Sequence, residues 1–498
     1  MAILSELEPK PVFRYFEEIC GIPHGSTNTK KLSDHLMIFA EQHHLRAEQD
    51  SMNNVIIWKG GTPGYEKSAP VMIQGHIDMV CEKEEDCDID FEKEGIRLQL
   101  RDGIISAQGT TLGGDDGIAV AYMLALLDST EIPHPPLEAV FTVDEEIGML
   151  GAAGIDAAGL KARIMLNVDS EEEGYLLVSC AGGVMAVAEL PVERQETRGY
   201  CAKLVVTGLQ GGHSGVEIHK GRANANQLMG RVLYELSRST GTGAGSEFPR
   251  DPAFRIVRVS GGLKDNAIPR AAEAELVLCV STLDEVRQLQ KKVDELSGIC
   301  QRELSRTDPN VRLELEAAKE ISSVSAMTGD VTKKVVAALV SLPGGVQRMS
   351  ADIEGLVQTS LNLGKLVTEE GKVLFSFAVR SSVETEKQEL VNRMGCLMEM
   401  LGGTVACRGD YPAWEYRPDS PLRDLMMRVF EEQYGREPEI QAIHAGLECG
   451  LFAGKLPGLD CVSFGPDMRD IHTPKEAMDA ESVRRTWEYI LEVLRRLK

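Results

Sequence analysis

The first part of the chain alternates short apolar runs with longer segments of helical periodicity. Short apolar runs, which we interpret as strands, occur at 54–58, 71–73, 137–143 and 164–168. Helices are expected around 12–19, over 27–44 and over 118–127, the last one following the glycine-rich turn 113–117. Strands that alternate with helices predict an α/β sheet, and ligands of such sheets gather at the carboxyl ends of the strands.

The pattern changes after residue 183 and returns near the end of the chain. The middle part has alternating strands such as 202–207 and long amphipathic helices at 225–237 and 283–304. From residue 411 on, a helix over 421–434, a strand over 460–464 and a closing helix over 480–497 restore the α/β pattern.

This return predicts a discontinuous first domain, with a mixed sheet flanked by helices, that is interrupted by an inserted α+β domain. We expect the first domain to comprise residues 1–185 and 406–498 and the inserted domain to comprise 186–405. The inserted part is large enough for two α+β subdomains.

Composition excludes several classes of partner. The chain has 498 residues, a formal net charge of −24 and 43% hydrophobic residues. Such an acidic chain is not expected to bind nucleic acid or an anionic membrane surface. Its start lacks the features of a signal peptide, no apolar stretch approaches membrane-spanning length, and the eleven cysteines include no Cys-x-x-Cys pair. We therefore expect a cytoplasmic protein with reduced thiols.

The strand at 71–73 runs directly into two side chains that bind metals or take part in catalysis in many enzymes. His76 and Asp78 are separated by one residue, so they lie on one side of an extended backbone. Taken alone, His-x-Asp is more often a polar strand end with a hydrogen-bonded histidine. The interpretation changes only if further ligands follow other strands.

Further acidic and imidazole side chains do follow other predicted strands or lie in the adjoining loops. They are Asp115 with Asp116, Glu145 with Glu146, Asp169, and His472. Imidazole together with carboxylate suits zinc, manganese or cobalt, and one carboxylate can bridge two metal ions. If these residues converge in space, the sequence predicts a binuclear hydrolase.

The run 144–146 permits a division of roles. At a strand end both glutamates can turn toward one cavity, so that one binds metal while its neighbour holds a water molecule. A solvated acidic turn is the commoner explanation for such a run taken alone.

These motifs resemble, in the same order, the M20 family of metallopeptidases, and within it the aminoacyl-histidine (Xaa-His) dipeptidase branch. The motifs that carry the resemblance are His76-x-Asp78, Gly-Gly-Asp115-Asp-Gly, Asp-Glu145-Glu146-Ile-Gly-Met, Asn-Val-Asp169-Ser-Glu-Glu-Glu-Gly and His472-Thr-Pro. The resemblance implies a discontinuous zinc-peptidase domain with an inserted lid or dimerisation-type domain.

The resemblance also implies roles for individual residues. Asp115 would bridge two zinc ions, with cobalt or manganese as alternatives, while His76 and Asp169 complete one site and Glu146 and His472 the other. Glu145 would be the general base. Asp78 would orient His76 through the imidazole N–H. One position departs from the pattern, because Asp116 stands where the dipeptidases of the family have Asn.

In the middle part, the segment Gly211-Gly-His-Ser-Gly215 resembles the family segment that brings a histidine to the substrate. His213 would contact the developing oxyanion or the peptide C-terminus, and Asn266 and Arg380 would recognise the substrate carboxylate. A surface-loop histidine and a structural salt bridge are the alternatives for His213 and Arg380.

His444 and Glu448 lie in a segment that borders the active site in the family. Glu448 would contact either a substrate amino group or a residue behind the metal ligands.

The implied activity is hydrolysis of dipeptides with histidine in second position, by a water that metal activates and Glu145 deprotonates. Closure of the inserted domain would select short substrates. Three alternatives remain: a broader-specificity peptidase of the family, an N-acyl amino-acid hydrolase, and a catalytically silent binding protein. Whether the chain forms a homodimer is left open by the sequence.

Overall fold

The computed structural model describes residues 3–238 and 252–498, which divide into two compact units. Unit 1 consists of Met1–Cys180, Trp414–Ala442 and Leu447–Lys498, and unit 2 consists of Ala181–Ala413 and Ile443–Gly446. The ends of the segment Ala181–Ala413 lie close to the domain boundaries that we expect at 185 and 405. Each unit is described separately below.

Unit 1 is built on a mixed sheet that has eight strands within the described residues. In spatial order the strands are β1 (Arg46–Gln49), β2 (Val55–Lys59), β6 (Leu137–Thr142), β3 (Val71–His76), β7 (Ile164–Asn167), β21 (Asp460–Ser463), β8 (Tyr175–Cys180) and β20 (Glu439–Ile443). The neighbours β6, β3, β7 and β21 run parallel to one another, and the flanking pairs β2–β6 and β21–β8 are antiparallel. The strands predicted from apolar runs are confirmed.

The parallel strands determine where the candidate site residues gather. His76 ends β3 opposite Thr142 at the end of β6, and Gln74 lies opposite Asn167 at the end of β7. The segments that follow these strands therefore leave the sheet at the same edge. Because the order along the edge is set by strand pairing, residues more than 60 positions apart in sequence become neighbours.

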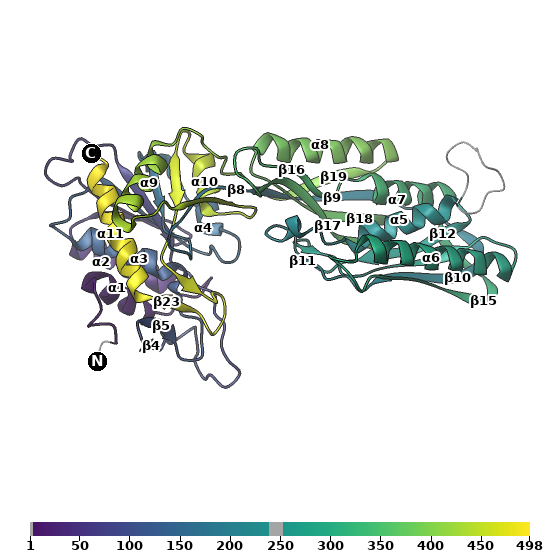
Figure 1. The fold of residues 1–498 in the computed structure, drawn as a ribbon, viewed down its shortest axis with the longest axis horizontal. Helices are drawn as coiled ribbons and strands as arrows, with labels where there is room; N and C mark the ends of the chain where they lie inside the picture. The colour runs from purple at the N-terminus through teal and green to yellow at the C-terminus, as the bar shows by residue number, and fades with distance from the viewer. Residues whose placement is uncertain (1–2, 239–251) are drawn as a thin grey trace. The chain divides into compact units, whose positions relative to one another are not determined.

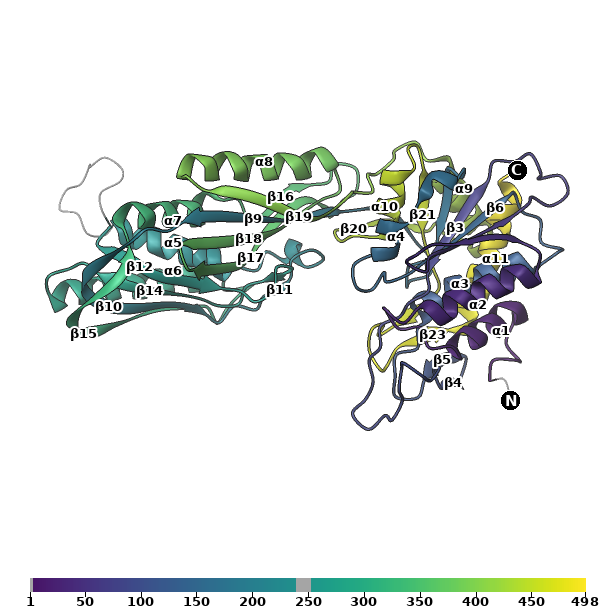
Figure 2. The same ribbon diagram turned by 180° about the vertical axis from the view of Figure 1, so that it is seen from behind.

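The helices of unit 1 comprise α1 (Lys10–Cys20), α2 (Lys30–Gln42), α3 (Gly114–Asp128), α4 (Leu150–Gly154), α9 (Pro421–Tyr434), α10 (Glu448–Lys455) and α11 (Ala480–Arg496). Helix α3 packs on β3 and α1, and α9 packs on β21 and α11 (Figures 1 and 2). Residues after Asp116 in α3 are buried on every face down to Leu127, so this helix is a central element. A small sheet of β4 (Leu98–Arg101), β5 (Ile104–Ala107), β22 (Met468–Arg469) and β23 (Ala477–Asp479) completes the unit.

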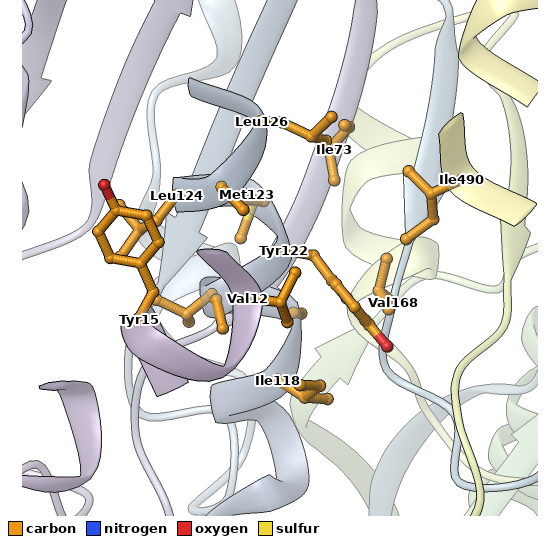
Figure 3. Close-up of a cluster of buried hydrophobic side chains, with 14 of the residues drawn as sticks. Val12, Tyr15, Ile73, Ile118, Tyr122, Met123, Leu124, Leu126, Val168 and Ile490 are labelled. Atoms are coloured by element: carbon orange, nitrogen blue, oxygen red, sulfur yellow. The ribbon is translucent and has the colours of Figure 1, made fainter. Parts of the chain in front are cut away.

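The core of unit 1 joins α3 to the strands and to the C-terminal helix. Figure 3 shows the side chain of Tyr122 of α3 beside Val168. Its hydroxyl donates a hydrogen bond to the carbonyl of Val483 at 2.8 Å, so a fully buried polar group is satisfied. This contact joins an early helix to the end of the chain and stabilises the discontinuous unit.

Unit 2 is built on a second sheet, with nine strands within the described residues. The order is β15 (Arg312–Met327), β10 (Arg194–Thr207), β14 (Ala272–Leu278), β12 (Phe254–Gly261), β17 (Val357–Glu369), β18 (Lys372–Ser381), β9 (Gly182–Pro191) and β19 (Thr404–Tyr411), and β16 (Gly345–Met349) pairs with β17. Every pairing in this sheet is antiparallel. One sheet therefore runs through the unit for which two subdomains were considered.

Helices α5 (Ala225–Arg238), α6 (Leu283–Glu303), α7 (Gly329–Ser341) and α8 (Glu384–Leu401) lie along this sheet in Figure 1. A two-stranded ribbon of β11 (Gly212–His213) and β13 (Ala267–Ile268) carries two of the predicted substrate-binding segments. Within the described ranges, no helix is both long and apolar enough to cross a membrane. All eleven cysteines are free thiols.

Candidate metal centre

Asp115 lies between the two predicted histidine ligands. Its Oδ1 is 3.2 Å from Nε2 of His76, and its Oδ2 is 3.1 Å from Nε2 of His472. The two oxygens of one carboxylate therefore face different imidazoles. This is the arrangement that a carboxylate bridging two metal ions requires.

Each histidine has a second carboxylate neighbour. Oδ1 of Asp169 is 3.6 Å from Nε2 of His76, and Oε1 of Glu146 is 2.9 Å from Nε2 of His472. The structure thus brings together all five residues predicted as metal ligands.

Asp116 is fully buried and lies beside the backbone of His76. Potential ligand atoms within 4.8 Å of one another form two groups that share His76, one with Asp115 and Glu146 and the other with Asp116 and Asp169. Oδ2 of Asp116 already accepts the backbone N–H of His76 at 3.1 Å, whereas both oxygens of Asp115 face imidazoles. Asp115 is therefore the better candidate for the bridging position.

Gly75 allows α3 to approach the strand that carries His76. A Cβ atom at this position would lie 2.4 Å from Oδ2 of Asp116 and 2.6 Å from Cβ of Ala119. Any side chain at this position would therefore displace Asp116 or the helix.

Asp78 is buried and organises the loop that carries both glutamates. Its Oδ1 accepts the backbone N–H of Glu145 at 3.1 Å, and its Oδ2 accepts the N–H of Glu146 at 3.4 Å and the hydroxyl of Ser26 at 2.9 Å. Nδ1 of His76 lies 2.9 Å from the carbonyl oxygen of Asp78 and 3.5 Å from its carboxylate. The imidazole is thus oriented first by the backbone of Asp78, and the carboxylate mainly supports the glutamate loop.

The neighbouring carboxylates favour the protonated, positively charged form of both histidines. Hydrogen bonds that His472 donates to Asp115 and Glu146 raise the pKa of His472 to about 10. Burial lowers the pKa of His76, but Asp115, Asp169 and Asp78 outweigh it and raise the pKa well above its ordinary value. Burial, together with nearby carboxylates, raises the pKa of Glu145 to about 9.

The directions of these pKa shifts indicate whether the site suits divalent cations. Burial also raises the pKa of Asp116, with the charge of Asp169 adding to it, and Oδ1 of Asp116 has no hydrogen-bond partner among the described residues. A cluster that favours protonation of two imidazoles and of several of its carboxylates is one in which added positive charge is favourable. The donor set of imidazole and carboxylate therefore fits zinc, cobalt or manganese.

Glu476 was not predicted from the sequence, yet it holds the turn before Asp115. One oxygen accepts the N–H groups of Leu112 at 2.8 Å and Gly113 at 3.2 Å, and the other accepts those of Gly114 at 2.8 Å and Asp115 at 3.4 Å. The free N–H groups of a helix start attract a carboxylate, but sequence alone does not say which acidic residue will supply it.

Glu448 lies apart from the ligand cluster. It is fully buried at the start of α10, and its Oε2 accepts hydrogen bonds from Gln74 and, at 2.7 Å, from Thr142. Gln74 in turn accepts a hydrogen bond from Asn167 at 2.7 Å. Of the two roles considered for Glu448, this burial supports the one behind the metal ligands, since no part of its carboxylate is exposed to a substrate amino group.

The predicted substrate-binding residues of unit 2 converge around Gly215. A Cβ atom on Gly215 would lie 2.7 Å from the carbonyl oxygen of His444, 3.0 Å from Cε1 of His213 and 3.2 Å from Nε of Arg380. Asn266 and Arg380 both line a cavity of about 370 Å³ in this unit, together with Tyr411, whose hydroxyl accepts a hydrogen bond from Arg380 at 2.9 Å. Lys264 and Lys365 add positive charge to the same cavity.

The two imidazoles of this group are held in the neutral form. Nδ1 of His213 accepts the backbone N–H groups of Gly215 at 3.1 Å and Val216 at 3.2 Å, so the ring proton is on Nε2. Burial, with the charge of Arg380, lowers the pKa of His213 and lowers that of His444 to about 3. Nε2 of His444 lies 2.7 Å from the hydroxyl oxygen of Ser360.

Comparison with known proteins agrees with this geometry. The sequence pattern of peptidase family M20/M25/M40 matches residues 72–496, which include every predicted metal ligand. The chain belongs to peptidase family M20/M25/M40. Within the M20 relatives, it is 35% identical over 500 residues to the cytosol non-specific dipeptidase of Escherichia coli strain K12, covering 100% of this chain and 99% of that protein.

Solved structures of similar proteins share this fold. The crystal structure of aminoacylhistidine dipeptidase from Vibrio alginolyticus superposes with a TM-score of 0.89 at 36% identity, covering 99% of this chain and 97% of that one. Aminopeptidase PepT from Bacillus cereus ATCC 10987 shares the fold, with a TM-score of 0.54 at 15% identity over 99% of each chain. The M20 fold predicted from the sequence is confirmed.

Proposed function

We propose that this chain is a metal-dependent dipeptidase that hydrolyses Xaa-His and related dipeptides. The observation that carries the proposal is the position of Asp115, whose two carboxylate oxygens face the imidazoles of His76 and His472. The names of the E. coli and V. alginolyticus relatives support peptide hydrolysis as the reaction.

We propose two zinc ions as the resident metals, with cobalt or manganese as alternatives. His76, Asp115 and Asp169 would hold one ion, and Asp115, Glu146 and His472 the other. When bound, the ions would polarise the scissile carbonyl and make water acidic enough to lose a proton near neutral pH.

Glu145 is the proposed general base. It lies beside Glu146 on the loop that Asp78 holds by two backbone hydrogen bonds. In this position its carboxylate would take a proton from the attacking water and pass it to the leaving amine.

The group around Gly215 in unit 2 is the proposed binding site for the carboxyl end of the substrate. Arg380 offers a planar donor group to a carboxylate, and Asn266 lines the same cavity. His213 carries its proton on Nε2 and would donate a hydrogen bond to the developing oxyanion. His444, as a neutral imidazole, would shape this site without adding charge.

Substrate range separates the proposal from its nearest alternative. A broader-specificity peptidase or an N-acyl amino-acid hydrolase would use the same ligands, and the word "non-specific" in the name of the E. coli relative favours a wide choice of dipeptides. The name of that relative also supports a cytoplasmic location. A homodimer remains a further proposal, to be tested by the mass of the purified protein in solution.

The test measures bound metal per chain and the rate on an Xaa-His dipeptide, before and after chelation. We expect two equivalents of metal and activity that is lost on chelation and restored by zinc. Equal efficiency on N-acetyl amino acids would contradict the dipeptidase assignment. If metal-loaded protein cleaves no peptide, while Glu145→Ala leaves binding to a partner protein unchanged, the chain is instead a silent binding protein.

A further inference from the structure

Unit 1 contains a second cavity, of about 710 Å³, beside the candidate ligand Glu146. Its walls come from the loop at Gly25 and Ser26, from residues 79–83 and 88–92 of the segment that follows β3, and from Glu146 with Ile147. The volume lies within the range of about 300–1,000 Å³ that is usual for small-molecule sites. None of the roles described above uses this cavity.

One part of the cavity is apolar. Met79 and Ile89 are buried, Phe91 is half-buried and Ile147 is exposed, and all four contribute to the lining. Phe91 and Ile147 leave apolar surface exposed here, which an extended hydrocarbon side chain could cover and remove from water.

The rest of the lining is acidic. Glu82, Asp88, Asp90 and Glu92 line the cavity in addition to Glu146, whereas Lys83 is the one basic residue in the lining, and its ammonium group donates to the carbonyl of Ile89 at 2.8 Å. Asp88 pairs with Arg97 at 2.6 Å and Asp90 with Lys93 at 2.7 Å.

Glu82 and Glu92 are exposed, and neither forms an ion pair within residues 3–238 and 252–498. Their negative charges therefore remain available to an occupant of the cavity.

The walls are held in place by backbone hydrogen bonds. Thr111 N–H donates to the carbonyl of Glu82 at 3.0 Å, Glu84 N–H donates to that of Gly109 at 2.9 Å, and Ser26 N–H donates to that of Met79 at 3.3 Å. Backbone hydrogen bonds therefore fix the positions of the segments that line the cavity.

We infer that this cavity receives the side chain of the substrate's N-terminal residue and favours lysine and arginine there. The inference rests on the proposed function, because it takes Glu146 to be a metal ligand next to the scissile bond. Lysine and arginine combine a long aliphatic stem, which matches the apolar wall, with a positive end that matches the acidic lining.

Charge also determines which end of the peptide the cavity accepts. The C-terminal residue carries a carboxylate, which this lining would repel, and the cationic cavity with Arg380 is in unit 2. The acidic cavity is therefore assigned to the N-terminal residue.

The experiment compares kcat/KM of the full-length, metal-loaded protein on Lys-His, Leu-His, Ala-His and Glu-His. We expect Lys-His to exceed Glu-His by about 10-fold or more, with a ratio that falls as salt is raised, because exposed charges are screened. The double variant Glu82→Gln/Glu92→Gln should lower the ratio of Lys-His to Leu-His by about 3- to 10-fold.

A matched control removes two exposed acids of the same loop that do not line the cavity. Glu85→Gln/Asp86→Asn should leave the ratio of Lys-His to Leu-His unchanged. If Ala-His is cleaved but Lys-His and Glu-His are cleaved equally well, the cavity assignment is wrong and the proposed function stands. If none of the four dipeptides is cleaved, both fail.

Discussion

The backbone N–H of Glu145 donates a hydrogen bond to Oδ1 of Asp78 at 3.1 Å, which joins the segment after β3 to the segment after β6. Asp78 is almost completely buried, and burial alone would raise its pKa. The hydrogen bonds from His76 and from Glu145 N–H outweigh this effect and hold the pKa of Asp78 below its ordinary value. Asp78 is therefore a charged anchor for the loop that carries Glu145 and Glu146.

Removal of this anchor should weaken the site without removing a ligand. For Asp78→Ala we expect metal affinity or kcat/KM to fall by about 10- to 100-fold, the usual effect of losing a residue that orients metal ligands. Calorimetric titration with zinc and steady-state kinetics would measure both quantities. Asp78→Asn, which keeps one acceptor oxygen, should lose less. Complete loss of one metal equivalent would mean that Asp78 is itself a ligand.

Substitution of Glu145 should slow the chemical step and leave the metal content unchanged. Glu145→Gln keeps the shape of the side chain but cannot accept the proton of the attacking water, so kcat should fall by about 100- to 10,000-fold. Metal analysis of the same sample should still give the wild-type number of ions. A variant that retains its activity would exclude Glu145 as the base.

His213 should act on the transition state. Its Nε2–H is the donor, because Nδ1 is occupied by two backbone N–H groups. We expect His213→Ala to lower kcat by about 100- to 1,000-fold, the effect of losing one oxyanion donor. His219→Ala, at an exposed position of the same segment, is the control. An increase in KM with unchanged kcat would instead assign His213 to ground-state binding.

Glu476 should stabilise the turn at Asp115. Each buried N–H group left without an acceptor costs about 1–3 kcal/mol, and Glu476→Ala leaves up to four of them unsatisfied. We expect a clear fall in Tm together with weaker zinc binding. Glu481→Ala removes an exposed glutamate from the first turn of α11 and should change Tm little. Equal Tm values for the two variants would show that the turn does not depend on Glu476.

Glu448 should make stability depend on pH. Burial raises its pKa to about 7 from an ordinary value of 4.5, so the folded state favours the protonated form. Its contribution to the free energy of unfolding is about 3 kcal/mol. This contribution is complete below pH 4.5 and is lost as the pH rises through 7. Glu448→Gln removes this titration.

Urea unfolding of wild type and Glu448→Gln, both treated with chelator, would measure the effect at pH 5 and pH 8. We expect the wild type to lose stability relative to the variant at the higher pH. A difference between the two proteins that does not change with pH would be evidence against protonation of Glu448.

Local patterns along the chain determined a large part of this description. Apolar runs and helical periodicity predicted β3, β6, β7, β21 and the main helices, because those patterns follow from the burial of one face of each element. The ordered motifs around His76, Asp115, Glu145, Asp169 and His472 predicted the family, since the chemistry of a metal site restricts which residues can follow those strands.

Only the tertiary structure decided which role each of these residues has. Parallel pairing of β6, β3 and β7 places His76, Asp78 and Glu145 at one edge, and the C-terminal segment brings His472 and Glu476 to the turn at Asp115. Asp78 supports the glutamate loop, Glu476 accepts hydrogen bonds from four N–H groups, and Glu448 is buried. Each of these features depends on contacts between residues that are far apart in the sequence. A sequence shows which groups are available, but pairing, burial and desolvation, which depend on the whole fold, decide the partner and the charge of each group.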